Sequence, residues 1–168
     1  DPAVMDLCAG SGAIAVSIAH SRPDSSVWAM ELSQEAFPYL ERNICQNQVP
    51  VTPLLADVFT PPNQLPPLDL VLSNPPYIRQ TELPGLQTQV QWEPVMALDG
   101  GADGLAFYRA LPSIWQPKLK PGGWIAFEVG YDQADTVCAL LEAAGFTRVD
   151  SRRDLAGIRR AVFGQRPQ

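Results

Sequence analysis

Residues 3–20 read AVMDLCAGSGAIAVSIAH, which predicts an apolar strand over Ala3–Cys8, a glycine-bearing turn and a short helix over Ala13–His20. Gly10 and Gly12 let the backbone of the turn approach a ligand closely, while the first N–H groups of the helix point outward. Tight strand–helix turns need glycine for their geometry anyway, so the turn alone does not identify a ligand. It predicts that the chain opens with a β–α unit of a wound α/β sheet.

The rest of the chain repeats this alternation of strands and helices. We expect further strands over Ser26–Glu31, Val51–Ala56, Asp69–Ser73 and Trp124–Val129, and helices over Gln34–Asn47, Leu105–Leu119 and Asp132–Ala144. Ser33 is expected to cap the second helix, and the Pro-Gly-Gly of residues 121–123 to end the third. Phe146–Ser151 and Arg160–Gly164 are joined too closely for a helical crossover, so they should pair antiparallel. The predicted fold class is α/β and Rossmann-like: a mainly parallel seven-stranded sheet with an antiparallel C-terminal strand and helices on both faces.

Length and composition narrow the class of protein. The 168 residues, 46% of them hydrophobic, predict a single domain over residues 1–168 with a buried core. A formal net charge of −6 disfavours non-specific binding to nucleic acid, which depends on lysine and arginine. No apolar run reaches the roughly 18 residues that a membrane span needs. Cys8, Cys45 and Cys138 form no C-x-x-C pair and His20 is the single histidine, so we expect no metal site.

Polar residues stand at the ends of the expected strands. The turn at Gly10 follows the first strand, Glu31 ends the second, Asp57 follows the third and Asn74 follows the fourth. Because the carboxyl ends of parallel strands share one edge, we expect these residues to lie together. Glu31 stands about 20 residues after the turn, where a carboxylate can accept hydrogen bonds from ribose hydroxyls; the alternative is a solvated surface charge. A nicotinamide nucleotide and S-adenosylmethionine both fit these features.

Residues 74–77, Asn-Pro-Pro-Tyr, favour one of the two cofactors. Asn74 carries an amide that both accepts and donates, and Pro75 and Pro76 have a fixed φ and no N–H. Their carbonyl groups can point at a ligand, and Tyr77 offers a flat face for packing. Such a group can hold a planar nitrogen in front of a reactive carbon, and it has no role in hydride transfer. The alternative is a plain proline turn, but the acidic strand ends beside it indicate an S-adenosylmethionine-dependent methyltransferase acting on an amide or amino nitrogen.

The chain resembles the peptide chain release factor N5-glutamine methyltransferases over essentially its whole length. The tetrapeptide is shared with adenine methyltransferases, whereas residues 92–105 resemble a segment characteristic of the glutamine enzymes. The matching stretches are Asp6–Gly12, Trp92–Leu98, Gly100–Leu105, Phe127–Gly130 followed by Gln133, and Asp154–Gly157 followed by Arg160. Cys8 and Arg159 depart from the pattern, because many members have glycine and an acidic residue there. The family's N-terminal helical domain and lead-in motif do not precede the first strand, so we expect a fragment of a longer protein.

The resemblance implies a class I S-adenosylmethionine-dependent methyltransferase fold, S-adenosyl-L-methionine as cofactor, and class I release factors as protein substrates in the cytoplasm. The implied methyl acceptor is the side-chain amide nitrogen (N5) of the glutamine in their Gly-Gly-Gln motif. The implied catalytic residues are Asn74, Pro75, Pro76 and Tyr77. The implied cofactor-binding residues are Asp6, Gly10, Gly12, Glu31, Asp57, Val58 and Asn74. The implied substrate-binding residues are Asn74, Pro75, Tyr77, Glu93 and Pro94. We expect a monomer that does not bind nucleic acid directly.

Two alternatives stay open at this point. A nucleic-acid methyltransferase acting on N6 of adenine or N4 of cytosine shares the fold and the tetrapeptide, but the acidic composition and the Glu93-Pro94 segment count against it. A truncated domain could bind S-adenosylmethionine without turning over a substrate. A nicotinamide-dependent dehydrogenase ranks below both, because no catalytic pairing of histidine, tyrosine or lysine is evident in the sequence.

Overall fold

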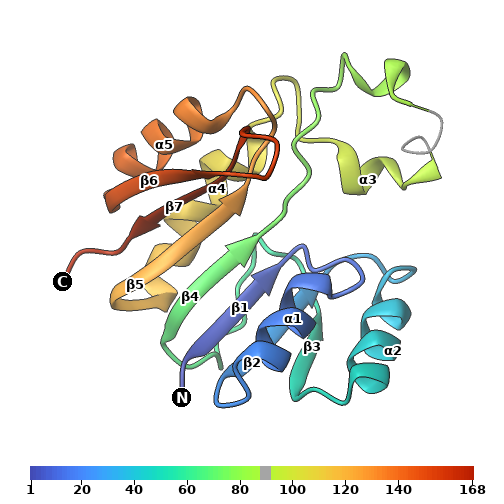
Figure 1. The fold of residues 1–168 in the computed structure, drawn as a ribbon, viewed down its shortest axis with the longest axis vertical. Helices are drawn as coiled ribbons and strands as arrows, with labels where there is room; N and C mark the ends of the chain where they lie inside the picture. The colour runs from blue at the N-terminus through green and yellow to red at the C-terminus, as the bar shows by residue number, and fades with distance from the viewer. Residues whose placement is uncertain (88–91) are drawn as a thin grey trace.

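The computed structural model describes residues 1–87 and 92–168 and contains a seven-stranded sheet in the order β3-β2-β1-β4-β5-β7-β6 (Figure 1). The strands are β1 (Ala3–Leu7), β2 (Ser26–Glu31), β3 (Val51–Leu55), β4 (Leu68–Ser73), β5 (Leu119–Glu128), β6 (Thr147–Arg153) and β7 (Arg159–Gln165). β1 pairs in parallel with β2 and β4, β2 with β3, and β4 with β5. β7 lies antiparallel between β5 and β6. The predicted fold class, including the antiparallel C-terminal strand, is confirmed.

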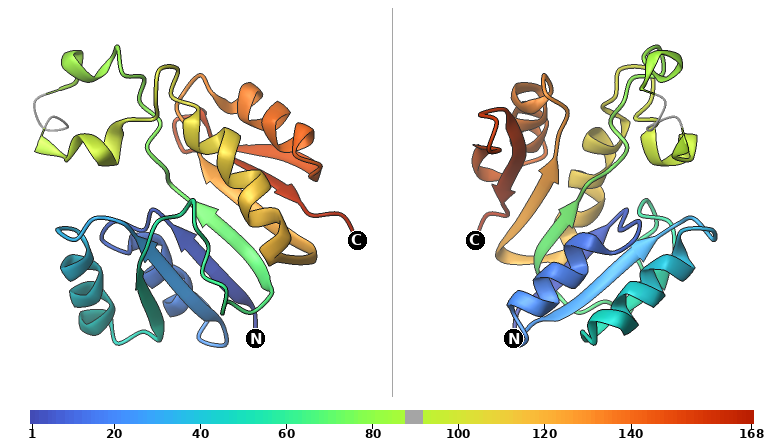
Figure 2. Two further views of the ribbon diagram at one scale, coloured as in Figure 1. Left: turned by 180° about the vertical axis from the view of Figure 1, so that it is seen from behind. Right: turned by 45° about the vertical axis from the view of Figure 1, so that its right-hand side comes forward.

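Helices pack on both faces of this sheet (Figure 2). α1 (Ala13–Ser21) and α2 (Phe37–Asn47) lie on one face, and α4 (Ala106–Trp115) and α5 (Ala134–Ala143) lie on the other. Side chains alternate between the two faces along a strand. In β1, Val4 therefore packs with residues of α1 and α2, and Met5 packs with residues of α4 and α5. The apolar run at the start of the chain therefore contributes side chains to the hydrophobic core on each face of the sheet.

The Pro-Gly-Gly of residues 121–123 does not end a helix, as expected from the sequence, but forms an irregularity inside β5. α4 ends at Trp115, and a 3-10 turn, η3 (Gln116–Lys118), leads directly into the strand. The pairing with β4 shifts register here, and Gly122 takes a φ of 80°, which favours glycine. The helix stops early because Pro117 has no N–H to donate to the preceding turn.

α2 begins at Phe37 rather than at Gln34, because Ser33 forms a turn of its own. The Oγ of Ser33 accepts hydrogen bonds from the N–H groups of Glu35 and Ala36, at 3.2 and 3.1 Å. Ser33 thus caps the turn that precedes the helix, and Ala36 takes the N-cap position. The remaining predicted strands and helices agree with the structure apart from a few residues at their ends.

The segment between β4 and α4 forms a separate layer beyond the carboxyl ends of the strands (Figure 1). It contains a 3-10 turn, η1 (Leu83–Gly85), and one turn of helix, α3 (Val95–Leu98). Residues 88–91 of this segment lie outside the described residues. A parallel bridge between Ile78 and Asp99 joins its two ends. Within residues 1–87 and 92–168, no helix combines the length and the hydropathy needed to cross a membrane.

Candidate active site

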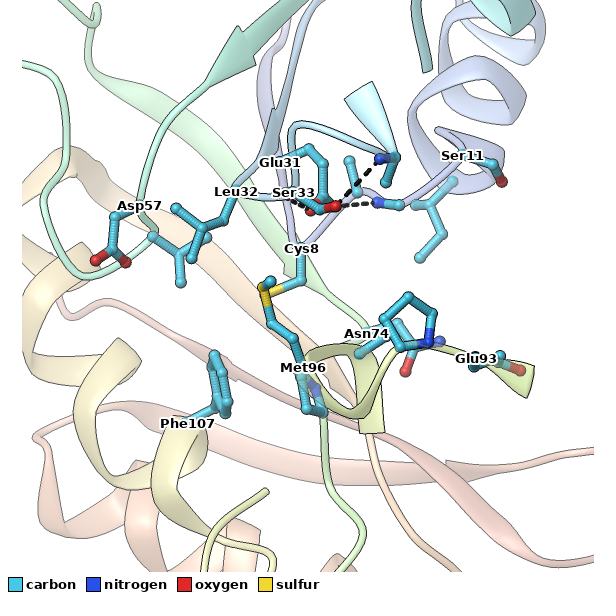
Figure 3. A pocket seen from close by; sticks show the side chains of 18 of the residues that line it. Cys8, Ser11, Glu31, Leu32, Ser33, Asp57, Asn74, Glu93, Met96 and Phe107 are labelled. Atoms are coloured by element: carbon cyan, nitrogen blue, oxygen red, sulfur yellow. Dashed lines mark hydrogen bonds between the residues drawn. The ribbon is translucent and has the colours of Figure 1, made fainter. Parts of the chain in front are cut away.

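A pocket of about 440 Å³, called the first pocket below, opens at the carboxyl ends of β1, β2, β3 and β4. Glu31 and Ser33 lie on one side of it, and Asn74, Met96 and Phe107 on the other (Figure 3). The residues predicted from the sequence that line it are Gly10, Glu31, Asp57, Val58, Asn74, Pro76, Glu93 and Pro94. The structure thus brings the four predicted strand ends together around one cavity.

Glu31 joins two turns of the first pocket. Its Oε2 accepts a hydrogen bond from the Gly10 N–H, and its Oε1 accepts one from the Ser33 N–H, both at 2.7 Å (Figure 3). The carboxylate is buried, so these bonds fix it between the β1–α1 turn and the chain after β2. A carboxylate offers about four acceptor positions. Among the residues that the structure describes, two hydrogen bonds to this carboxylate are present, which leaves about two acceptor positions for the hydroxyl groups of a ligand.

Asp6 and Gly12 lie behind the turn rather than in the lining of the first pocket. The buried Oδ2 of Asp6 accepts the Ala15 N–H at 3.0 Å, whereas its Oδ1 has no hydrogen-bond partner among the described residues. Burial raises the pKa of Asp6 to about 7; the Ala15 hydrogen bond opposes this rise. Gly12 has a φ of 83°, and a Cβ there would lie 2.4 Å from the Cδ1 of Leu40. Both residues shape the turn, and their direct contact with a cofactor stays a prediction.

The Asn-Pro-Pro-Tyr tetrapeptide leaves β4 beside a second pocket, of about 400 Å³. The residues that border both pockets are Asn74, Pro76, Glu93 and Ala97. Pro75 and Tyr77 border the second pocket. Burial raises the pKa of Tyr77, so its hydroxyl stays neutral at physiological pH. The exposed Asn74 therefore stands in a wall shared by two cavities, each large enough for a small molecule or a side chain.

Sequence reasoning missed the apolar wall of the first pocket. Phe59 and Phe107 lie with their ring centroids 5.2 Å apart, and both line the pocket together with Leu32 and Met96. Phe59 could have been found, because it lies two residues after Asp57 in the turn that follows β3, and the Oδ1 of Asp57 accepts the Phe59 N–H at 2.9 Å. Phe107 comes from α4, and no local pattern in the sequence indicates that it reaches this pocket.

Cys8 lines the first pocket with a φ of 56°, in the left-handed region that favours glycine. Burial raises the pKa of its thiol to about 12, and the negative charges of Glu31, Asp6 and Asp57 add to the rise. The thiol is therefore protonated at neutral pH, and it is a poor nucleophile. Cys8 shapes the pocket without supplying thiolate chemistry.

The lining of the first pocket fits S-adenosylmethionine. A Cβ built on Gly10 meets no atom within 4 Å, so the turn leaves open space for a ligand to approach its backbone. Glu31 keeps acceptor positions for ribose hydroxyls. The aromatic wall formed by Phe59 and Phe107, with the Asp57 carboxylate beside it, suits a purine ring that carries an amino group.

Comparison with known proteins agrees with this geometry. Residues 1–93 match the family described as Methyltransferase small domain. The chain belongs to this methyltransferase family. As a methyltransferase domain, it takes S-adenosyl-L-methionine as its cofactor.

Relatives of this methyltransferase domain share its sequence along nearly its whole length. A protein of Clostridium acetobutylicum named Release factor glutamine methyltransferase is 40% identical, over 97% of this chain and 59% of its own. A protein of the same name from Burkholderia pseudomallei is 41% identical, over 99% of this chain and 60% of its own. The chain therefore spans about three fifths of the length of these curated relatives.

Solved structures support the fold. A methyltransferase from Pyrococcus furiosus superposes with a TM-score of 0.73 at 18% identity, over 99% of this chain and 75% of that chain. TrmN from Thermus thermophilus superposes with a TM-score of 0.66 at 21% identity, over 99% of this chain and 44% of that chain. At such identities the likeness concerns the arrangement of the methyltransferase domain and not its substrate.

Proposed function

We propose that this methyltransferase domain transfers a methyl group from S-adenosyl-L-methionine to the side-chain amide nitrogen (N5) of the glutamine in the Gly-Gly-Gln motif of class I peptide chain release factors. The observation that carries the proposal is the Asn-Pro-Pro-Tyr wall between the two pockets. The names of the two relatives support this substrate. The likeness of residues 92–105 to the glutamine enzymes supports it as well.

The first pocket holds the cofactor in this proposal. Glu31 accepts hydrogen bonds from the ribose hydroxyls, and Asp57 and Val58 face the adenine. The turn at Gly10 leaves room for the methionine part. Asp6 acts from behind, because its hydrogen bond to the Ala15 N–H holds the start of α1 against the turn.

The second pocket holds the glutamine side chain. A primary amide is a weak nucleophile because its lone pair is delocalised, so the protein contributes mainly by placing it. Asn74 Oδ1 and the Pro75 carbonyl accept the two amide hydrogens, which orients the nitrogen and offsets the positive charge that develops on it. The neutral Tyr77 packs against the aliphatic part of the glutamine. Glu93 and Pro94 contact the neighbouring residues of the substrate loop.

The chemistry needs no strong base. S-adenosyl-L-methionine supplies a methyl group on a positively charged sulfur: as the nitrogen–carbon bond forms, the carbon–sulfur bond breaks, the sulfur keeps the electron pair and the amide nitrogen releases one proton to solvent. Asn74 lowers the cost of that charge through a neutral acceptor, which does not compete for the methyl group. We further propose that the domain acts as a monomer in the cytoplasm and does not contact nucleic acid, which its net charge of −6 supports.

Mass spectrometry of a purified, unmethylated release factor tests the proposal. After incubation with the protein and S-adenosyl-L-methionine, one added methyl group is expected on the glutamine of the Gly-Gly-Gln motif. Methyl transfer to RNA or DNA oligonucleotides, with none to the release factor, would replace the proposal with the nucleic-acid alternative. Binding of the cofactor without transfer to any of these would reduce the chain to a binding domain.

A further inference from the structure

Gln133, in the turn between β5 and α5, holds three separate segments together. Its Nε2 donates hydrogen bonds to the Tyr77 carbonyl at 3.0 Å and to the Gly104 carbonyl at 3.1 Å. Its Oε1 accepts the Gly130 N–H at 2.9 Å. The residue is 3% exposed. Removal of a buried side chain that satisfies this many polar groups leaves those groups without partners.

The backbone around Tyr77 is packed closely at the same place. A Cβ at Gly104 would lie 2.4 Å from the Tyr77 carbonyl oxygen and 2.7 Å from the Nε2 of Gln133. A Cβ at Gly100 would lie 2.7 Å from the Cα of Tyr77. The Ile78 N–H donates to the Leu98 carbonyl, and the Gly100 N–H donates to the Ile78 carbonyl, both at 2.9 Å. The returning end of the segment over residues 78–104 therefore presses on the end of the tetrapeptide.

We propose that Gln133 is a positioning residue for methyl transfer. It fixes the Tyr77 carbonyl against the β5–α5 turn and closes the base of the segment that carries Glu93 and Met96. Pro75 and Pro76 stiffen the tetrapeptide, so fixing its last residue also fixes the direction of Asn74. Gln133 lines neither pocket, and its effect on the reaction passes through these residues. The inference rests on the proposed function.

A second interaction between the end of the tetrapeptide and the β5–α5 turn is weaker. Arg79 forms ion pairs with Asp132 at 2.7 Å and with Glu82 at 3.0 Å. The Arg79 and Asp132 side chains are 31% and 38% exposed, and such surface pairs contribute little to stability. The buried amide of Gln133, not this ion pair, is therefore the main connection between the tetrapeptide and the β5–α5 turn.

The experiment replaces Gln133 with a side chain of similar length that cannot donate a hydrogen bond and accepts one only weakly. Gln133→Met is expected to lower kcat for release factor methylation by roughly tenfold to a hundredfold, because small displacements of positioning groups have effects of that size. The KM for the release factor and the Kd for S-adenosyl-L-methionine should stay within about threefold of the parent values, because Gln133 touches neither pocket. Gln165→Met is the matched control. Its Nε2 donates to the Gly122 carbonyl at 2.7 Å, at the opposite end of the sheet, and kcat should not change.

Hydrogen exchange tests the connection without any substrate. The amides of Ile78 and Gly100 should exchange at least about tenfold faster in Gln133→Met than in the parent protein, and at the parent rate in Gln165→Met. In the parent protein, the side-chain amide hydrogens of Gln133 should exchange slowly, because both are bonded to carbonyls. This last measurement needs no variant, so fast exchange would overturn the proposal, and slow exchange would support the hydrogen bonds that it depends on, even if Gln133→Met does not fold.

An unchanged kcat in folded Gln133→Met would overturn the proposal. A loss of cofactor affinity equal to the loss of rate would overturn it too, because Gln133 would then support the first pocket instead. Fast exchange of the Gln133 side chain in the parent protein is the third contrary result. If the parent protein leaves the release factor unmethylated, the proposed function has failed, and the exchange rates still decide whether Gln133 holds the tetrapeptide.

Discussion

The two sides of the first pocket are built in opposite ways. The side that runs through Glu31 belongs to the sheet, and the two hydrogen bonds of Glu31, both 2.7 Å, hold it before any ligand arrives. The side that runs through Met96 belongs to the segment between β4 and α4. There the residues Trp92, Val95 and Met96 are 83%, 63% and 54% exposed.

The difference matches two kinds of ligand. A small cofactor that is the same in every turnover is served best by a rigid side, because less order has to be created on binding. A protein substrate brings its own apolar surface, and exposed apolar side chains around a pocket are available to meet it. Asn74 stands where the two sides join, since it borders both pockets.

Asn74→Ala gives the largest expected effect and tests that junction. Methyl transfer should fall by roughly a hundredfold to a thousandfold, the range seen when a preorganised group that stabilises developing charge is removed. Affinity for S-adenosyl-L-methionine should stay within a few-fold of the parent value, because Glu31 and the apolar wall remain. Single-turnover methylation and calorimetric titration of the cofactor measure the two quantities.

Asn47→Ala is the control for this variant, since Asn47 bonds to the Asn43 carbonyl on the exposed surface of α2. Its rate of methyl transfer should equal that of the parent protein. If Asn74→Ala lost cofactor binding and methyl transfer to the same degree, Asn74 would belong to the cofactor side, and the assignment of the junction would be wrong.

The dependence of stability on pH tests the role of Asp6, which lies behind the turn on the rigid side of the first pocket. Burial raises its pKa from an ordinary 3.8 to about 7, so the folded protein binds this proton more tightly than the unfolded chain does. The stabilising contribution is complete below about pH 4 and is lost as the pH rises through 7. At about 1.4 kcal/mol per pKa unit, the free energy of unfolding falls by up to about 4 kcal/mol across this range. Urea unfolding at pH 5 and pH 8 should show about 2 to 3 kcal/mol of this fall in the parent protein, because Asp6 of the unfolded chain is already ionised at pH 5, and a smaller fall in Asp6→Asn.

Asp69→Asn is the control that shows whether the fall in stability comes from a buried carboxyl such as Asp6 or from a hydrogen-bonded one such as Asp69. The Ala3 N–H and Lys120 lower the pKa of Asp69, so its contribution to stability is lost only as the pH falls below the ordinary range of a carboxyl. This variant should therefore keep the parent's fall in stability between pH 5 and pH 8. An equal fall in Asp6→Asn and the parent would show that Asp6 is not the source.

Glu31→Gln should weaken the rigid side itself. One oxygen of the carboxylate becomes an amide NH₂ that faces a backbone N–H, either that of Gly10 or that of Ser33. The Kd for S-adenosyl-L-methionine should rise by about tenfold, in line with the loss of one charge-assisted hydrogen bond. At saturating cofactor, kcat should change little. Glu35→Gln, on the exposed turn before α2, should leave the Kd unchanged; a similar rise there would point to net charge rather than to the two hydrogen bonds.

Trp92→Ala gives the smallest expected effect on the fold and tests the exposed side. Because Trp92 is 83% exposed, the free energy of unfolding should change by less than about 0.5 kcal/mol. The KM for the release factor should rise by a few-fold, since an exposed aromatic residue at an interface often contributes to binding. Tyr39→Ala, which removes an aromatic ring 63% exposed on α2, is the control and should leave that KM unchanged. A loss of stability in Trp92→Ala would mean that the segment between β4 and α4 packs as tightly as the side of the first pocket that contains Glu31.

Features of the fold and the site could be predicted from the sequence where they depend on residues close together in the chain, and not where they depend on contacts between distant segments. The strand and helix order follows from short apolar runs, and Glu31 and Asp57 could be placed because parallel strands bring their carboxyl ends to one edge. Phe107 and the contacts of Gln133 depend on how α4 and the β5–α5 turn pack against residues far away in the sequence. The prediction for the Pro-Gly-Gly of residues 121–123 is wrong for the same reason: glycine and proline usually end an element, but here pairing with β4 and β7 continues the strand after the irregularity.

A wall shared by two cavities has a thermodynamic consequence. Any shift of Asn74 that one ligand causes alters the cavity of the other, so the two binding free energies are coupled. Coupling of this kind is reciprocal: for the proposed glutamine substrate, by whatever factor the bound cofactor strengthens binding of the side chain, the side chain strengthens retention of the cofactor. After methyl transfer the same coupling joins the two products, and the departure of one sets how readily the other leaves.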